Sequence, residues 1–415
     1  MTDRPIREAH AHIAMHGRCM AMCDLSLCAT RDDMIRRLAD HRPEPSGWTL
    51  AHGARPEAWP DPRWPTRTEL DAAVRDRPLA AWGFDAHSIV ANSAALERAG
   101  ISARTQCPGG VIELDPRGEP TGLLLEHAAL RLWDAVPDPT PEQRLTHARD
   151  ALDQLAGLGY AEIHDLRSQT WLPGVLDSLA QAGELPCRVV LWPLVEDVGT
   201  VRAELASCGH LLRLGGAKIF VDGTLNSRTA WTLEPCADPL PDAPLGTALL
   251  TTRQIADTVA RVGDLELPIA AHAIGDGAVR AVLDAIELAG GPRLGHRIEH
   301  LELVHPLDVP RFASLGVIAS VQPCHLLADA DVLRRLYADR LERVLPLRSL
   351  IDAGCTPGTG MLFGSDVPIV RADPSDSIQA AVHRRRPDTP VSAAIAPESA
   401  ISETEAWSCF QCEST

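Results

Sequence analysis

Two hydrophobic periods alternate along residues 140–384. Apolar residues that recur every three or four positions predict amphipathic helices, and the short continuous apolar runs between them predict buried strands. The first helix is expected over 141–158, with Leu145, Leu152 and Leu155 on one face and Gly159 after its end. Further helices are expected at 172–182, 198–208, 252–262, 276–289, 307–315, 341–353 and 375–384. Strands are expected at 161–165, 188–194, 216–222, 268–272, 296–301, 317–322 and 361–366.

One more strand is predicted within residues 1–13, which gives eight β units. Strands that alternate with helices favour a parallel sheet, and eight units favour an α/β fold of the closed (β/α)8 TIM-barrel type. Residues 14–139 break the alternation and are rich in Pro, Trp, Asp and Arg, so we expect an irregular insertion over the barrel mouth. The expected divisions are 1–13 as strand 1, 14–139 as the insertion, 140–390 as the remaining barrel and 391–415 as a tail.

Charge and composition narrow the class of protein. The 415 residues carry a net charge of −17, which disfavours a nucleic acid or an anionic membrane as partner. No apolar run is long enough to span a membrane, and no apolar segment follows the charged N-terminus as in a secretory signal. The 11 scattered cysteines read as reduced thiols, so we expect a cytoplasmic protein that acts on a small molecule. A homodimer is one expected assembly.

Ligand-type side chains stand at the predicted strand ends. Two histidines spaced i, i+2, His10 and His12, point the same way from a strand. Lys218, His272, His300 and Asp366 each end a later apolar run. Because the active site of a barrel lies at the C-terminal strand ends, we expect these side chains to converge.

This set of residues favours a metal-dependent hydrolase. Imidazoles and carboxylates are suitable zinc ligands, and a bound divalent metal activates water and polarises a carbonyl. His10, His12 and Asp366 could hold one metal, and His272 and His300 another. Asp366 is also expected to take the proton of the attacking water and pass it to the leaving amine.

Each residue also has a structural interpretation. His272 could be a core histidine, His300 a partner of Arg297 or Glu299, and Asp366 a helix N-cap. Lys218 could form a buried ion pair. Taken singly, these readings are as good as the metal site, and the convergence of all the strand ends is what favours the site.

Substrate-binding candidates lie in the predicted mouth loops. Arg228, in the polar loop after the strand at 216–222, could bind a substrate carboxylate or could order the loop itself. Gln322 and His325 follow the strand at 317–322 and could contact substrate. His87, in the insertion, is a further candidate.

Two groups of cysteines stand apart from these motifs. Cys19, Cys23 and Cys28 lie near the start of the chain, and Cys409 and Cys412 near its end. They could bind a structural zinc ion if the two groups met. Free thiols are the favoured interpretation.

In combination, these segments resemble the amidohydrolase superfamily, specifically its third amidohydrolase-type family, whose members are called YtcJ-like. The matching segments are 10–12, 92–100, 118–122, 218–229, 272–276, 297–300, 322–323 and 364–368. The resemblance implies a metal-dependent hydrolase of C–N bonds other than peptide bonds, acting on an amide, formamide or N-acyl substrate through a metal-activated hydroxide. It also implies two divalent metal ions, expected to be zinc, bridged by Lys218 in N6-carboxylated (carbamylated) form.

The chain departs from the family in two places. Family members usually carry a companion β-sandwich built from both chain ends, and here it is expected to be reduced or absent. Glu8 stands where the family commonly has an aspartate. The alternative functions are a barrel with one metal ion or a non-catalytic barrel that binds a small ligand.

Overall fold

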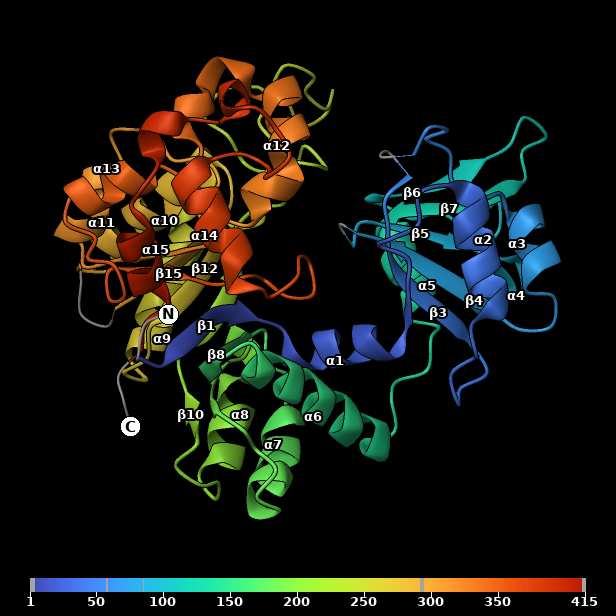
Figure 1. The fold of residues 1–415 in the computed structure, drawn as a ribbon, viewed down its shortest axis with the longest axis horizontal. Coiled ribbons are helices and arrows are strands. Elements are labelled where there is room, and N and C mark those ends of the chain that lie inside the picture. Colours follow the sequence, from blue (N-terminus) through green and yellow to red (C-terminus); the bar gives the residue numbers. More distant parts are fainter. Residues whose placement is uncertain (1–3, 57–58, 85, 292–294, 413–415) are drawn as a thin grey trace. The chain divides into compact units, whose positions relative to one another are not determined.

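The computed structural model of the chain describes residues 4–56, 59–84, 86–291 and 295–412 (Figure 1). It forms two compact units, one of residues 1–14 with 148–415 and one of residues 15–147. The larger unit has the predicted α/β character, with parallel strands and helices between them. Each unit is described below by itself.

The first sheet of the larger unit has four parallel strands. They run in the order β1 (Ile6–Ala11), β8 (Tyr160–Leu166), β9 (Arg188–Trp192) and β10 (Leu212–Leu214). The connecting helices are α6 (Pro141–Gly157), α7 (Leu172–Gln181) and α8 (Val198–Leu205). Helix α7 packs against α8 (green in Figure 1).

The second sheet of this unit has five parallel strands in chain order. They are β11 (Ala217–Phe220), β12 (Ile269–Ala273), β13 (Arg297–His300), β14 (Ile318–Val321) and β15 (Met361–Phe363). The accompanying helices are α9 (Thr252–Gly263), α10 (Asp276–Leu288), α11 (Val309–Ser314), α12 (His325–Leu336), α13 (Leu347–Asp352), α14 (Pro374–His383) and α15 (Glu403–Phe410).

Isolated parallel bridges connect the two sheets at both edges. Ala11 pairs with Val367 beyond β15, and Leu194 beyond β9 pairs with Lys218 of β11. The second junction follows Gly215 and Gly216. A Cβ atom at Gly215 would lie 2.4 Å from the Trp192 ring, and one at Gly216 would lie 2.3 Å from the carbonyl oxygen of Pro268. Only glycine therefore lets the chain pass from β10 to β11 against Trp192.

Burial explains why these runs form strands and helices. All five residues of β12 are buried, as expected for a parallel strand covered on both faces. Helix α9 buries Ile255, Ala256, Val259 and Val262 along one face, and Thr251 caps it in a capping box with Gln254. The apolar positions that predicted these elements are therefore the positions that the structure buries.

The smaller unit contains a six-stranded mixed sheet, so the expectation of an irregular insertion is wrong. Its strands are β2 (Cys23–Asp24), β3 (Thr49–Ala54), β4 (Leu79–Gly83), β5 (Ser88–Ala91), β6 (Gly110–Leu114) and β7 (Pro120–Glu126). They run in the order β2-β3-β4-β5-β7-β6, parallel from β2 to β4 and antiparallel thereafter. Helix α1 (Ile13–Ala21) precedes this sheet.

Both faces of this sheet are covered by helices. In β5, Ile89 and Ala91 join one apolar cluster and Val90 joins the other, as alternation along a strand requires. The first cluster includes residues of α4 (Ser93–Arg98) and α5 (His127–Trp133). The second includes residues of α2 (Arg31–Asp40) and α3 (Arg67–Ala73). The unit therefore has three layers, helix, sheet and helix.

Several predicted elements of the larger unit agree closely with the structure, and others were missed, among them helix α15 within the expected tail. The predicted helices at 141–158, 172–182, 252–262 and 276–289 correspond to α6, α7, α9 and α10. Helix α12 and strand β10 were not predicted. After β15 the described chain forms the helices α14 and α15 and two short 3-10 turns, at Val391–Ala393 and Pro397–Ser399. Within the described ranges, no helix combines the length and apolarity needed to cross a membrane.

Candidate metal centre

His10 and His12 both face the carboxylate of Asp366. Nε2 of His10 lies 3.4 Å from Oδ1 of Asp366, and Nε2 of His12 lies 2.8 Å from the same oxygen. Nδ1 of His12 lies 2.6 Å from the carbonyl oxygen of Leu166, to which it donates its proton. In the neutral form of this tautomer, Nε2 of His12 carries the lone pair that a cation would bind, on the side of the ring that faces Asp366.

Backbone contacts fix Asp366 beside the first strand. The amide of Asp366 donates to the carbonyl of His10 at 2.7 Å. Glu8 accepts through Oε1 from the amides of His10 and Ser365, both at 2.9 Å. A Cβ atom at Gly364 would lie 2.5 Å from the His10 nitrogen, so the close approach requires glycine. Glu8 thus holds together the two backbone segments that carry the candidate ligands His10 and Asp366.

Two candidate ligands have a strained backbone at the ends of their strands. His300 has φ +76° and Asp366 has φ +65°, in the left-handed region that non-glycine residues seldom adopt. Such strain costs of order 1–3 kcal/mol and is found mainly at functional sites. It marks these two side chains as held in place by their surroundings.

A row of imidazoles continues from His10. The ring centroid of His300 lies 4.9 Å from that of His10 and 4.4 Å from that of His272. Nε2 of His272 lies 3.2 Å from the carbonyl oxygen of Gly223. The three rings come from the strands β1, β12 and β13.

Lys218 lies in the same buried region. Its side chain is 1% exposed, and its Nζ lies 5.1 Å from the centroid of the Phe220 ring. Burial lowers the pKa of the Lys218 ammonium to about 8, against the opposing effect of Glu299 and Asp366. An amine with such a pKa is in part neutral at pH 7.

Electrostatics leave His10 and His272 neutral and Asp366 ionised. Burial, with Lys218 nearby, lowers the pKa of His10 to about 4 and that of His272 to about 3. Burial works to raise the pKa of Asp366, but His10 and His12 hold it below its ordinary value. Neutral imidazoles and an ionised carboxylate are the forms that ligate a divalent metal.

The unsatisfied atoms of the site fit a cation. Nζ of Lys218, Nε2 of His10 and Nδ1 of His300 are buried and have no hydrogen-bond partner among the described residues. Leaving one buried polar group unpaired costs about 1–3 kcal/mol, so three in one place need an explanation. Three groups of described residues have ligand atoms within 4.8 Å of one another: His10, His12 and Asp366; His300, His325 and Asp366; and Glu302, His325 and Asp329. Asp366 belongs to the first two groups.

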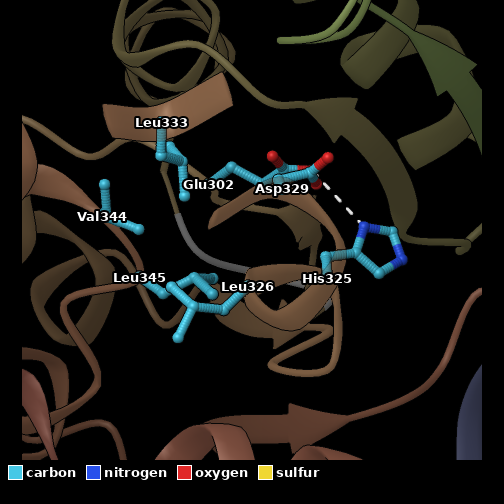
Figure 2. Close-up of a pocket in the computed structure, with 7 residues that line it drawn as sticks. All are labelled: Glu302, His325, Leu326, Asp329, Leu333, Val344 and Leu345. Carbon is cyan, nitrogen blue, oxygen red and sulfur yellow. Dashed lines mark hydrogen bonds and ion pairs between the residues drawn. The ribbon is translucent and has the colours of Figure 1, made fainter. Parts of the chain in front are cut away.

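A second polar cluster adjoins the site (Figure 2). His325 at the start of α12 lies with Nδ1 3.4 Å from Oε1 of Glu302, and Asp329 lies one turn further along α12. Burial opposes protonation, but Glu302 and Asp366 raise the pKa of His325 to about 9. Leu326, Leu333, Val344 and Leu345 line the rest of this region, where the space is too small for a water molecule. The cluster is packed around the ion pair between His325 and Glu302.

The predicted substrate-binding residues lie in different places. Arg228 forms an ion pair with Asp238, Nη1 to Oδ2 at 2.8 Å. Gln322 is 1% exposed, and its Nε2 lies 3.3 Å from Nδ1 of His10, so it contacts a candidate ligand. His87 lies in the smaller unit, 2.9 Å from Glu126. Its role in substrate binding stays a prediction.

Other buried polar residues of the site were not predicted. Arg297 and Glu299 lie two residues apart on β13, directly before His300, and Nδ1 of His10 lies 2.7 Å from Oε2 of Glu299. Their i, i+2 spacing on an apolar strand was a usable signal. Glu302 and Asp329 had no such signal, because helix α12 was missed. No group of metal-ligating residues found within the described ranges includes a cysteine.

Comparison with known proteins assigns the family. Residues 7–414 match the sequence model of the amidohydrolase family. YtcJ of Bacillus subtilis, which carries the name of an amidohydrolase, is 30% identical over 91% of this chain and 72% of its own length. The N-substituted formamide deformylase of Arthrobacter pascens is 27% identical over 96% of this chain and 76% of its own length.

Solved structures agree with this assignment. An uncharacterized metal-dependent hydrolase from Pyrococcus furiosus superposes with a TM-score of 0.75 at 27% identity, covering 98% of this chain and 80% of that one. A second, from Pyrococcus horikoshii, gives a TM-score of 0.78 at 25% identity, covering 98% and 79%. The resemblance noted in the sequence is therefore confirmed, and this chain belongs to the amidohydrolase family.

Proposed function

We propose that this protein is a metal-dependent hydrolase of C–N bonds other than peptide bonds, with an amide, formamide or N-acyl compound as substrate. The observation that carries the proposal is the convergence of His10, His12, His300 and Asp366, with unpaired buried nitrogens, in a member of the amidohydrolase family. The relative that deformylates N-substituted formamides supports the choice of bond.

The proposal includes a closed (β/α)8 barrel. The parallel bridges Ala11 to Val367 and Leu194 to Lys218 support closure, since they lie at both gaps between the two sheets. If β10 and β11 are two halves of one strand interrupted at 215–216, the unit has eight strands. In such a barrel the candidate ligands would share the mouth, where barrel enzymes have their active sites.

The first proposed metal site is the group of His10, His12 and Asp366, which would hold one divalent ion. His272 and His300, whose ring centroids lie 4.4 Å apart, would hold another, with zinc suited to these donors. When bound, such ions lower the pKa of water and polarise the carbonyl of the substrate. Lys218 would join them after its neutral Nζ adds to CO2, forming an N–C bond and releasing one proton. Its burial and its lack of a hydrogen-bond partner within the described chain support this role.

Asp366 would carry the proton during hydrolysis. Its carboxylate is held ionised by His10 and His12, so it can accept a proton from the attacking water. It would then pass that proton to the nitrogen of the leaving amine. The backbone amide of Asp366 donates to the carbonyl of His10, so the main chain that carries this carboxylate is held beside the first strand.

The test combines metal analysis with a substrate panel. Protein purified in metal-replete buffer should contain about two divalent ions per chain and should hydrolyse at least one of a panel of formamides, amides and N-acyl amino acids. A single ion with activity would favour the mononuclear alternative and overturn the bridging role of Lys218. Bound metal without turnover across the panel would overturn the enzymatic proposal in favour of a ligand-binding barrel.

A further inference from the structure

A buried chain of hydrogen bonds reaches His10 from the side opposite Asp366. We propose that Glu299, held by Arg297, is a positioning residue that fixes the tautomer of His10, with the proton on Nδ1 and the lone pair of Nε2 directed at the metal. The inference rests on the metal-binding part of the proposed function, and it assigns a role to two residues of β13 that the chemistry above does not use.

The contact between His10 and Glu299 carries the argument. Nδ1 of His10 lies 2.7 Å from Oε2 of Glu299, and the side chains are 1% and 0% exposed. A carboxylate accepts and does not donate, so the proton lies on Nδ1 of His10. Charge-assisted bonds of this length are the strong ones. Nε2 on the other side of the ring is left as the lone pair.

Two other contacts would favour the opposite tautomer, and both are weaker. Nε2 of Gln322 lies 3.3 Å from the same Nδ1, which is 0.6 Å longer than the contact with the charged Glu299. Nε2 of His10 lies 3.4 Å from Oδ1 of Asp366, which is 0.7 Å longer than its contact with Glu299 through Nδ1. Nε2 of His10 forms no hydrogen bond in the described structure. The short contact with Glu299 therefore decides the tautomer.

Arg297 holds Glu299 in place. Its Nε lies 2.9 Å from Oε1 of Glu299, and its Nη2 donates to Oε2 at 3.2 Å. The same Nη2 donates to the carbonyl of Ala9 at 2.7 Å and to Oγ of Ser320 at 2.8 Å. The guanidinium carbon lies 4.9 Å from the centroid of the Trp192 ring. These contacts come from four strands and hold the guanidinium of Arg297 in one position.

The chain of contacts continues beyond Arg297. Nη1 of Arg297 lies 2.7 Å from Nδ1 of His164, and since guanidinium only donates, that nitrogen is the acceptor. Nε2 of His164 then carries the proton and donates to Oε1 of Glu162 at 3.0 Å. Along the chain from Glu162 through His164, Arg297 and Glu299 to His10, each hydrogen bond thus has one donor and one acceptor, without conflict between neighbouring bonds. A metal-ligating histidine whose other nitrogen is fixed in this way binds metal more tightly.

The first experiment reads the tautomer directly. In the full-length chain freed of metal by chelation, the two ring nitrogens of His10 can be distinguished by 15N NMR, with His10→Gln as the assignment control. We expect a protonated Nδ1 and a bare Nε2. A proton on Nε2 would overturn the proposal, and this outcome does not depend on substrate or on activity.

The second experiment compares two variants that disturb the same cluster. Glu299→Gln weakens the bond to His10, whereas Ser320→Ala removes an acceptor of Arg297 and leaves His10 untouched. Measured by competition with a chromophoric chelator, zinc binding should weaken about 10- to 100-fold in Glu299→Gln and less than about threefold in Ser320→Ala. Equal weakening in both, at equal melting temperatures, would mean a merely structural role. If Glu299→Gln does not fold, the 15N NMR measurement of the His10 tautomer in the unchanged protein still tests the proposal.

Discussion

Nε2 of His12 lies 2.8 Å from Oδ1 of Asp366, although the two residues are 354 positions apart in the sequence. The contact exists because the segment after β15 hydrogen-bonds to β1, His12 to Val367 at 3.0 Å and Asp366 to His10 at 2.7 Å. The first and the last strand therefore build the site together. Changes at this junction should affect catalysis and metal binding more than they affect the rest of the fold.

Replacing Asp366 by asparagine should abolish turnover while the chain stays folded. The amide keeps the shape of the carboxylate but cannot accept the proton, and general acid–base catalysis contributes about 10²- to 10⁴-fold. We expect kcat to fall by that factor and part of the bound metal to remain. Steady-state kinetics and elemental analysis check both points.

The matched control for this variant is Asp257→Asn, an exposed aspartate on α9 that pairs with Arg253. It should leave kcat unchanged. Undiminished turnover in Asp366→Asn would exclude Asp366 as the proton carrier.

Truncation of Lys218 should be reversible by a small carboxylate. Lys218→Ala leaves a buried space next to the imidazoles and removes the side chain proposed to carry the carbamate, so metal content should drop toward one ion or none. Added formate or acetate can occupy that space and supply the lost carboxylate. We expect partial recovery of metal content and kcat with rising carboxylate concentration, measured by elemental analysis and kinetics. Full metal content without any additive would contradict the bridging role.

The free energy of unfolding should fall in acid because His164 is buried in its neutral form. Burial lowers the pKa of His164 to about 3, from 6.5 in the unfolded chain, so between these values the unfolded state binds the extra proton. The contribution of His164 is therefore complete above pH 6.5 and is lost as the pH falls toward 3. Between pH 6.5 and pH 4 the loss is at most about 3 kcal/mol at 1.36 kcal/mol per pKa unit.

The variant His164→Gln isolates this effect. Glutamine can accept from Arg297 and donate to Glu162 but does not titrate. Urea unfolding of the metal-free chain between pH 4 and pH 7 should show a shallower pH dependence in the variant than in the parent. Parallel curves would show that His164 is not buried in neutral form.

Arg228 could have either of two roles, and steady-state kinetics can distinguish them. If it binds a substrate carboxylate, Arg228→Ala should raise KM about tenfold or more for N-acyl amino acids and leave uncharged formamides unaffected. If it only orders its loop through Asp238, Asp238→Ala should have the same effect as Arg228→Ala on every substrate. Comparing the two variants on both substrate classes decides between them.

Much of the larger unit could be predicted because burial there follows simple periods. Helix α10 buries nine of its residues and begins at Asp276, and β12 is a continuous apolar run. The candidate ligands could be found because each ends such a run. The backbone strain at His300 and Asp366 could not, since φ depends on packing around the strand ends.

The smaller unit was missed because its strands are short and poor in β-forming residues. Strand β4 is Leu-Ala-Ala-Trp-Gly, and alanine and glycine are depleted in strands. Strands β3, β4 and β5 are also buried on both faces, so they lack the alternation that marks a half-exposed strand. Helix α12 was missed because it starts at His325, directly after a segment with a proline that reads as a loop.

The most direct test of metal convergence is anomalous scattering from crystals of metal-replete protein, with data collected on both sides of the absorption edges of zinc, iron and manganese. We expect two anomalous peaks, one within bonding distance of Nε2 of His10 and of His12, and one beside His272 and His300, with continuous density beyond Nζ of Lys218. Ordered side chains with no anomalous peak among them would contradict the proposed metal centre.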